Sequence, residues 1–365
     1  MQIALVGLPR SGRTTVFNAL TRGHAETALF STGGEQPNVG VAKVPEERLP
    51  FLAELFRPKR VVPAEVQYMD MPESREEGKG HGIGGQYLNI LQQCDALLHV
   101  VRAFRDPGVP HEEGSVDPYR DVESMDLELA FSDLAILERR VQRLEVGLKG
   151  AKPSQRDAVL REKEALTPIK AALEKDTPIR EQRIPPDLTT TLENYQFLTA
   201  KPLLVVFNIG EEDLARAGEL EEEMRQRLSR PGVAGAALCG KLEMELAQMS
   251  PEEEAEFRRS LGLGQSGLER IIRISYDLMG LISFFTGGDQ EVHAWTIARG
   301  TVGQKAAGKV HSDMERGFIR AEVVAYDDLH RCGSLAEARK QGLLRLEGKT
   351  YEVRDGDVIK FLFNV

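Results

Sequence analysis

The amino-acid sequence predicts an α/β protein built on a mostly parallel sheet, with an inserted helical hairpin and a smaller mixed module in its C-terminal part. Three observations predict this class. Short apolar runs alternate with helical patterns, a heptad pattern interrupts that alternation, and short strand patterns take over near residue 281. A chain of 365 residues is also too long for one hydrophobic core, which favours two or three domains.

Five apolar runs predict strands buried in a parallel sheet, at residues 3–6, 64–69, 96–101, 202–208 and 233–238. Helical patterns lie between most of these runs, for example at residues 48–56 and 85–94. Because parallel strands are joined by crossover helices, we expect helices on both faces of the sheet.

A glycine-bounded loop, GLPRSGRT at residues 7–14, joins the first predicted strand to a helix with Val16 and Phe17 on its inner face. Strand, loop and helix in this order are the context of a phosphate-binding P-loop. The glycines let backbone N–H groups converge on an anion, and the helix N-terminus adds the positive end of its dipole. The predicted nucleotide-binding residues here are Gly7, Pro9, Arg10, Ser11, Gly12, Arg13, Thr14 and Thr15.

Arg13 departs from the P-loop pattern, which has lysine before the hydroxyl residue. An ammonium is a compact point charge that fits between phosphate oxygens, whereas a guanidinium is wider, planar and fixed in its fork. It still binds phosphate bidentately. Arg10 adds a second cation to the loop. We therefore expect nucleotide binding to be retained and hydrolysis to be slow.

Asp70 follows the predicted strand at residues 64–69, the place where a P-loop protein holds Mg²⁺ or its water. Thr14 supplies the hydroxyl ligand of the same expected metal site. The alternative role for Asp70 is a helix cap or a turn residue.

The sequence Asn208-Ile209-Gly210-Glu211 follows the fourth predicted strand, where GTPases place N-K-x-D to read guanine. The longer side chain of Glu211 cannot keep the bidentate geometry of aspartate on guanine, whereas an asparagine amide suits adenine N6 and N7. We expect adenine to be preferred, with Cys239 in the loop that packs on the base. The alternative is a simple turn at the strand end.

The middle of the chain predicts an antiparallel coiled-coil hairpin over residues 126–187. Leu127, Ala130, Leu134, Leu137, Val141, Leu144 and Leu148 recur at steps of three and four, and a weaker seam follows at Val159, Leu166, Ile169 and Leu173. The hairpin is interpreted either as a projecting arm that contacts a partner or as an ordinary helical subdomain with no partner.

The last 85 or so residues predict a β-rich mixed module. Strands are expected at residues 292–297, 317–325, 350–353 and 358–363, with a helix at 334–341 and a turn at 355–357. A local basic group, Lys305, Lys309, His311, Arg316 and Arg320, suits contact with a phosphate backbone. Trp295 is interpreted as a core residue, with stacking on a base as the alternative.

Composition limits the class of protein. The formal net charge of −10 excludes a molecule that binds polyanions with its whole surface. Three widely separated cysteines indicate a reducing compartment, no apolar run reaches the length of a membrane span, and the N-terminus has no leader pattern. We expect a cytoplasmic monomer with no membrane association.

Ten short motifs resemble the YchF/Obg-like ATPase family over nearly the whole chain. They are VGLP at 6–9, PNVGV at 37–41, KGHGIG at 79–84, HVVR at 99–102, NIGE at 208–211, AWTI at 294–297, AGKVH at 307–311, ERGFIRA at 315–321, GDV at 356–358 and FLFNV at 361–365. The resemblance implies a nucleotide domain at 1–125 and 188–279 that prefers ATP, an inserted hairpin, and a ubiquitin-like (β-grasp) TGS domain at 280–365. It also implies ribosome or RNA association through the hairpin and the TGS domain, and His111 as the catalytic residue.

The chain departs from the family pattern around the γ-phosphate. Glu73 replaces the glycine of the switch-II D-x-x-G, and Ser31 replaces a switch-I cysteine linked with redox control. Thr32 resembles the switch-I magnesium ligand, but two extra residues separate it from Pro37. The expected function is Mg²⁺-dependent binding of ATP and ADP with slow hydrolysis. The alternatives are a nucleotide-binding scaffold without useful turnover and a chain that has lost nucleotide binding.

Overall fold

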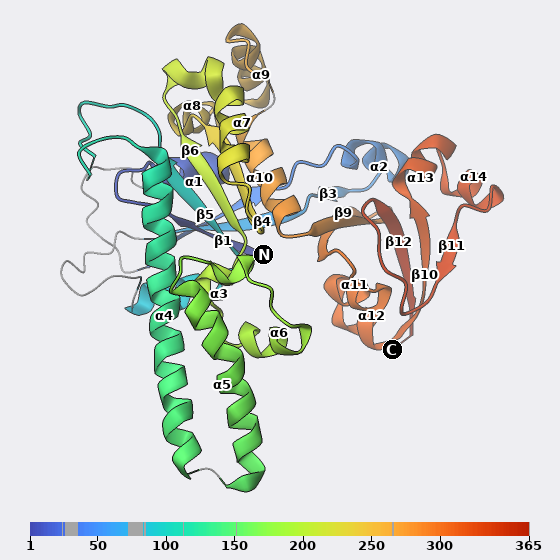
Figure 1. Cartoon of the computed structure of the whole chain (residues 1–365). Helices are drawn as coiled ribbons and strands as arrows, with labels where there is room; N and C mark the ends of the chain where they lie inside the picture. The colour runs from blue at the N-terminus through green and yellow to red at the C-terminus, as the bar shows by residue number, and fades with distance from the viewer. Residues whose placement is uncertain are drawn as a thin grey trace. The chain divides into compact units, whose positions relative to one another are not determined.

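The computed structural model describes the chain except residues 24, 26–35, 72–82, 84, 112, 151, 265 and 365 (Figure 1). The chain divides into two compact units. The first comprises Met1–Gly40 and Gln67–Leu268, and the second comprises Val41–Val66 and Glu269–Val365.

The first unit is built on a sheet of six strands in the order β2-β4-β1-β5-β6-β7. β1 pairs in parallel with β4 and β5, and the parallel pairing continues through β6 to β7. The strands are β1 (Gln2–Val6), β2 (Asn38–Lys43), β4 (Glu65–Asp70), β5 (Ala96–Arg102), β6 (Leu203–Asn208) and β7 (Val233–Leu238). The predicted parallel sheet is confirmed. β2 was missed because it is a largely exposed edge strand without an apolar run.

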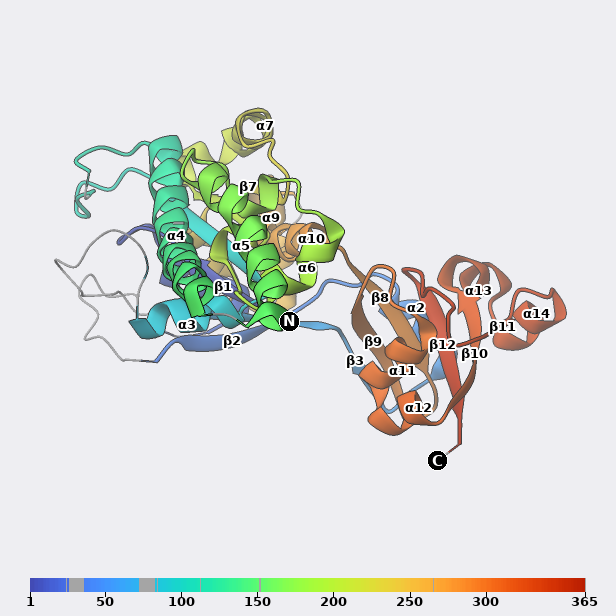
Figure 2. The same cartoon turned by 60° about the horizontal axis from the view of Figure 1, so that its bottom comes forward.

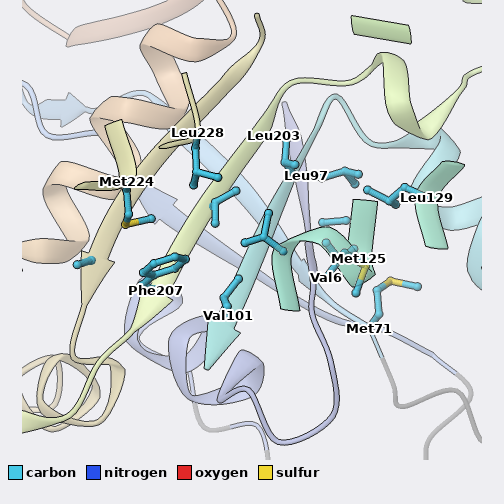
Figure 3. Packing of buried hydrophobic residues seen from close by; sticks show 14 of the residues in the cluster. Val6, Met71, Leu97, Val101, Met125, Leu129, Leu203, Phe207, Met224 and Leu228 are labelled. Atoms are coloured by element: carbon cyan, nitrogen blue, oxygen red, sulfur yellow. The ribbon is translucent and has the colours of Figure 1, made fainter. Parts of the chain in front are cut away.

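Helices of this unit include α1 (Arg13–Thr21), α3 (Gly85–Gln93), α6 (Pro186–Glu193), α7 (Ala217–Arg227), α8 (Gly240–Leu246) and α9 (Pro251–Ser260), with short 3₁₀ turns at Ile179–Glu181, Leu198–Ala200 and Glu211–Arg216. α10 (Gly267–Leu278) begins at the boundary and lies mostly in the second unit. Leu91 of α3, Met224 of α7 and Leu242 of α8 contribute to the main apolar cluster of the sheet. Val6, Leu97 and Val101 of the sheet pack in one cluster with Met125 and Leu129 of α4 (Pro118–Gly150) (Figure 3). This burial keeps β1 and β5 rigid beneath the loop that follows β1.

The remainder of α4 and α5 (Pro153–Leu173) form the predicted antiparallel hairpin (Figures 1 and 2). Leu137 and Leu144 pack with Leu166 and Ile169, and Arg140 forms an ion pair with Glu162 at 2.7 Å. Leu127 was wrongly placed in the seam. It is 42% exposed, because α4 begins at Pro118 and at this level buries Met125 and Leu129 in the sheet cluster.

The second unit contains a mixed sheet in the order β11-β10-β12-β8-β9-β3. Its strands are β3 (Arg60–Val62), β8 (Leu281–Gly287), β9 (Glu291–Ala298), β10 (Phe318–Ala325), β11 (Arg345–Glu347) and β12 (Asp357–Phe363). Its helices are α2 (Leu49–Phe56), α11 (Gly303–Val310), α12 (Ser312–Arg316), α13 (Tyr326–Cys332) and α14 (Leu335–Lys340). A parallel pair, β8 and β12, lies between two antiparallel pairs, as in a β-grasp.

Two expectations for this unit need correction. Residues 350–353 form no strand, and Glu352 makes only an isolated bridge with Val302. Residues 41–66 pack with the second unit, whereas the expected boundaries placed them in the nucleotide domain. The reason is long-range pairing: β3 adds in parallel to β9, and Arg48 forms an ion pair with Asp355 at 2.8 Å.

Trp295 packs against the apolar cluster of the second unit, and its Nε1 donates to Thr286 Oγ1 at 2.9 Å. Across the ranges that the structure describes, no helix is both long enough and apolar enough to cross a membrane.

Candidate phosphate-binding site

The loop between β1 and α1 curls so that the N-terminus of α1 faces its concave side without a side-chain cap. Ser11 N donates to Leu8 O at 3.2 Å, and Arg10 and Gly12 adopt φ values of 61° and 86°. No side chain caps α1 at Gly12. The first amides of a helix have no partner within the helix, so this arrangement offers N–H donors to an anion.

Both bounding glycines are required by close packing. A Cβ on Gly7 would lie 2.4 Å from Val100 O, and a Cβ on Gly12 would lie 2.1 Å from Asn208 Nδ2. Both distances are too short for a real Cβ contact. The loop is therefore pressed against the carboxyl ends of β5 and β6, where ligands of parallel α/β sheets bind.

Asp70, at the end of β4, receives hydrogen bonds from two adjacent residues of α1. Arg13 Nε donates to Asp70 Oδ1 at 2.7 Å, and Thr14 Oγ1 donates to Asp70 Oδ2 at 2.7 Å. Arg13 Nη2 also donates to the carbonyl oxygen of Met71. The Asp70 and Arg13 side chains are only 3% and 12% exposed. The guanidinium is thus turned toward the end of β4, where it neutralises the carboxylate.

The oxygens of Thr14 and Asp70 suit a magnesium ion that keeps most of its waters and shares nucleotide phosphates. Within the described ranges no cluster of three or more histidine, cysteine or acidic side chains could hold a metal by itself. The residues therefore fit magnesium bound together with a nucleotide, with Arg13 competing for Asp70 Oδ1.

Asn208, at the end of β6, links the loop to the segment after β7. Its Nδ2 donates to Ser11 O at 3.0 Å, and its Oδ1 accepts from Gly240 N at 3.0 Å. The side chain is buried. An amide held this way positions two loops, which is a different task from the adenine contact expected from the sequence.

The remaining predicted base-side residues differ in exposure. Glu211 is exposed and lies 3.4 Å from Lys241 Nζ in an ion pair. Cys239 is buried in the apolar cluster of the sheet, and burial raises the pKa of its thiol. Glu211 and Lys241 therefore present charge to solvent, whereas the thiol of Cys239 is buried.

The imidazole of His111 is nearly excluded from solvent, and both of its ring nitrogens have partners. Its Nε2 lies 2.8 Å from Asp121 Oδ2, and its Nδ1 accepts from Glu113 N at 3.1 Å. Arg10 Nη1 donates to Pro110 O at 3.2 Å, which connects the loop before His111 to the phosphate-binding loop. Asp121 was missed by sequence reasoning; the available signal was an acidic residue in the first turn of α4, ten positions after the histidine.

Arg102 organises the loop that leads to His111. From the end of β5 its Nη2 donates to Val109 O at 2.7 Å and its Nε donates to Phe104 O at 3.3 Å, and its guanidinium stacks on the Phe104 ring. The HVVR motif includes this residue, but the motif alone indicated no role for it.

His99 lies in the centre of β5 with both ring nitrogens buried and without a hydrogen-bond partner in the described chain. Burial lowers the pKa of His99 to about 4, so the ring is neutral.

Several predicted residues cannot be placed. Thr32, Ser31 and Glu73 lie outside the described residues. Pro9 and Arg10 are exposed at the tip of the loop, and Thr15 lies in the first turn of α1.

Comparison with known proteins gives consistent matches over the chain. A family model described as a 50S ribosome-binding GTPase matches residues 2–135. The YchF-GTPase C-terminal model, described as a protein of unknown function, matches residues 281–364.

Full-length relatives extend these matches. The ribosome-binding ATPase YchF of Bacillus subtilis is 41% identical over 364 residues, which cover 99% of this chain and 98% of the relative. The protein of the same name from Escherichia coli O157:H7 is 36% identical over 362 residues, with the same coverage. The solved YchF GTPase of Schizosaccharomyces pombe superposes with a TM-score of 0.84 at 28% identity, covering 99% of this chain and 97% of that one. The bacterial relatives are described as ATPases and the yeast structure as a GTPase, so these descriptions leave the base preference to be argued from residues.

Proposed function

The chain belongs to the YchF family, and on that basis we propose that it is a ribosome-associated P-loop NTPase that binds ATP and ADP and hydrolyses ATP slowly. The observation that carries the proposal is the uncapped N-terminus of α1 behind a loop whose two glycines are required by close packing. This arrangement suits the α- and β-phosphates of a nucleotide.

Adenine is the preferred base in this proposal. Reading guanine requires a carboxylate at a fixed distance from N1–H and the exocyclic amine, and Glu211 is one methylene longer than the aspartate that does so. Its carboxylate is also drawn toward Lys241. The site therefore lacks a carboxylate placed to read guanine. It still admits other bases, and GTP binds more weakly than ATP.

Magnesium accompanies the triphosphate, held through water and the phosphates by Thr14 and Asp70. When bound, the ion neutralises charge on the β- and γ-phosphates. Thr32 is the further candidate ligand from the sequence. His111 is the candidate base that orients the attacking water after it leaves Asp121.

A second candidate function is a nucleotide-binding scaffold with little or no hydrolysis. The Arg13–Asp70 ion pair favours it, because the cation that would stabilise the transferred phosphoryl group is engaged elsewhere. In both functions the partner is the ribosome or its RNA, contacted through the α4–α5 hairpin and the C-terminal unit, and the protein is a cytoplasmic monomer.

Calorimetric titration of the full-length protein with ATP, ADP and GTP tests the proposal. We expect ATP and ADP to bind more tightly than GTP, and the protein to sediment with ribosomes in the presence of ATP. Hydrolysis is then measured with and without ribosomes to separate the ATPase from the scaffold. Absence of binding by all three nucleotides would contradict both functions.

A further inference from the structure

We propose that Arg13 acts as the resident cation of Asp70, so that this protein binds nucleoside diphosphates with little dependence on divalent metal. The inference rests on the proposed nucleotide site and deepens it. In the usual P-loop arrangement a divalent cation and its waters neutralise this carboxylate and the phosphates together. Here the Arg13 side chain already neutralises the carboxylate.

In the Arg13–Asp70 pair, both carboxylate oxygens of Asp70 are engaged by side chains of α1. Oδ1 of Asp70 accepts from Arg13, and Oδ2 accepts from Thr14. A metal-bound water at Oδ1 must therefore share this oxygen with the guanidinium, whose positive charge opposes the approach of a cation. Because the pair is nearly excluded from solvent, its attraction is screened far less than that of a surface pair.

The planar fork of arginine explains why this occurs with Arg13 and not with a lysine. Nε reaches Asp70 while Nη2 reaches the carbonyl oxygen of Met71, so the guanidinium bridges the end of β4 and the following residue. A lysine ammonium carries its three N–H donors on one nitrogen, so it cannot place two separate nitrogens on these two acceptors as the guanidinium does. Arginine also stays protonated at every physiological pH, so protonation changes do not release it.

The phosphate-binding amides are independent of this side-chain pair. Arg13 and Thr14 use side-chain atoms to contact Asp70, while the loop offers backbone N–H groups to an anion. A diphosphate therefore binds as the free anion with Arg13 still on Asp70. Divalent metal must compete with a covalently tethered cation for the same oxygen.

The experiment measures the affinity of ADP and ATP by calorimetry in excess Mg²⁺ and in EDTA, using the full-length wild type, Arg13→Lys and Arg22→Lys. Arg22 follows the other end of α1 and is exposed, so it is a matched control for the same chemical change. For ADP, we expect removal of magnesium to change the affinity of the wild type and Arg22→Lys less than about threefold, and that of Arg13→Lys about tenfold or more.

A second readout follows the metal directly. Titration with Mn²⁺, detected by its electron paramagnetic resonance signal with ADP present, should show weak binding to the wild type and tighter binding to Arg13→Lys. If Arg13→Lys folds poorly, as judged by circular dichroism, Arg13→Gln provides the same test because it removes the cation.

The outcomes distinguish failure of this inference from failure of the proposed function. If the wild type binds ADP but loses affinity in EDTA as steeply as Arg13→Lys, the inference is overturned and the proposed function survives. If the wild type binds neither nucleotide in either buffer, both the function and the inference are overturned.

Discussion

His111 Nε2 lies 2.8 Å from Asp121 Oδ2, and this bond holds the candidate catalytic base against the first turn of α4. The N–H of Glu113 points at Nδ1, which leaves Nε2 to carry the proton that Asp121 accepts. The imidazole is only 7% exposed. Any role in hydrolysis therefore requires His111 to leave Asp121.

Asp121→Asn weakens the bond that retains His111. We expect ATP turnover to rise a few-fold in single-turnover assays with ribosomes, and stability to fall by about 1–3 kcal/mol because a buried charged acceptor is lost. Asp117→Asn, four residues earlier and immediately before the same helix, is the control. His111→Ala should abolish the gain, and an unchanged gain in the double variant would exclude His111 as the base.

Arg13→Lys combined with Glu73→Gly restores the two γ-phosphate contacts that the sequence lacks. At ~2–3 kcal/mol per contact, hydrolysis should rise by about three to four orders of magnitude. Quench-flow measurement of ATP cleavage checks this. A rate equal to that of the wild type would show that these positions do not limit turnover.

Asn208→Ala removes both hydrogen bonds that tie Ser11 to Gly240. We expect a loss of stability of about 1–3 kcal/mol, since two buried backbone groups lose their partner. Because the role is to position loops, affinities for ADP and for inorganic pyrophosphate should fall by the same factor. A loss confined to ADP would instead indicate direct contact with the base.

Glu211→Asp recreates the side-chain length that reads guanine. The ratio of GTP to ATP affinity should rise about tenfold, in line with one bidentate contact. Competition titrations with a fluorescent nucleotide measure the ratio, and Glu212→Asp at the adjacent position is the control. An unchanged ratio would place the base reader elsewhere.

His99→Leu tests the buried imidazole of β5. The pKa of His99 is lowered from 6.5 to about 4 in the folded protein. Between these values the unfolded chain binds more protons, so the stability of the wild type falls as the pH falls. Relative to His99→Leu, the wild type should lose about 3 kcal/mol between pH 7.5 and pH 4, measured by urea unfolding.

The measurement compares the stability of the wild type with that of His99→Leu, because Asp133 changes stability with pH in the opposite direction. Burial raises the pKa of Asp133 from 3.8 to about 6, so the folded state gains protons, and stability, as the pH falls through this window. Asp133 is present in both proteins and cancels in the difference. A flat difference would contradict the neutral buried state of His99.

Much of the fold was predictable because its signals are local. The run at residues 96–101 is apolar except for His99 and predicts a strand buried on both faces, and β5 is buried throughout. The heptad spacing from Ala130 to Leu144 predicts a seam, and these residues pack on α5. Residues 41–66 carry ordinary helix and strand patterns, which do not indicate the sheet that they join.

Part of the candidate site was predictable from the sequence, and part was not. The glycine spacing and the hydroxyl of Thr14 predict a phosphate-binding loop because backbone conformation and helix polarity follow from neighbouring residues. The engagement of Arg13 with Asp70, and of Asn208 with Ser11 and Gly240, was not predictable, since both depend on which strand ends meet in the sheet.

Local patterns along the chain were thus sufficient to specify a P-loop α/β domain, a helical hairpin and a β-rich module, because helix periods, strand runs and turn residues act over a few neighbours. Folding alone determined the partner of each charge. Arg13 meets Asp70 across 57 positions and Arg48 meets Asp355 across 307, and such pairs form only when segments far apart in the chain are brought together.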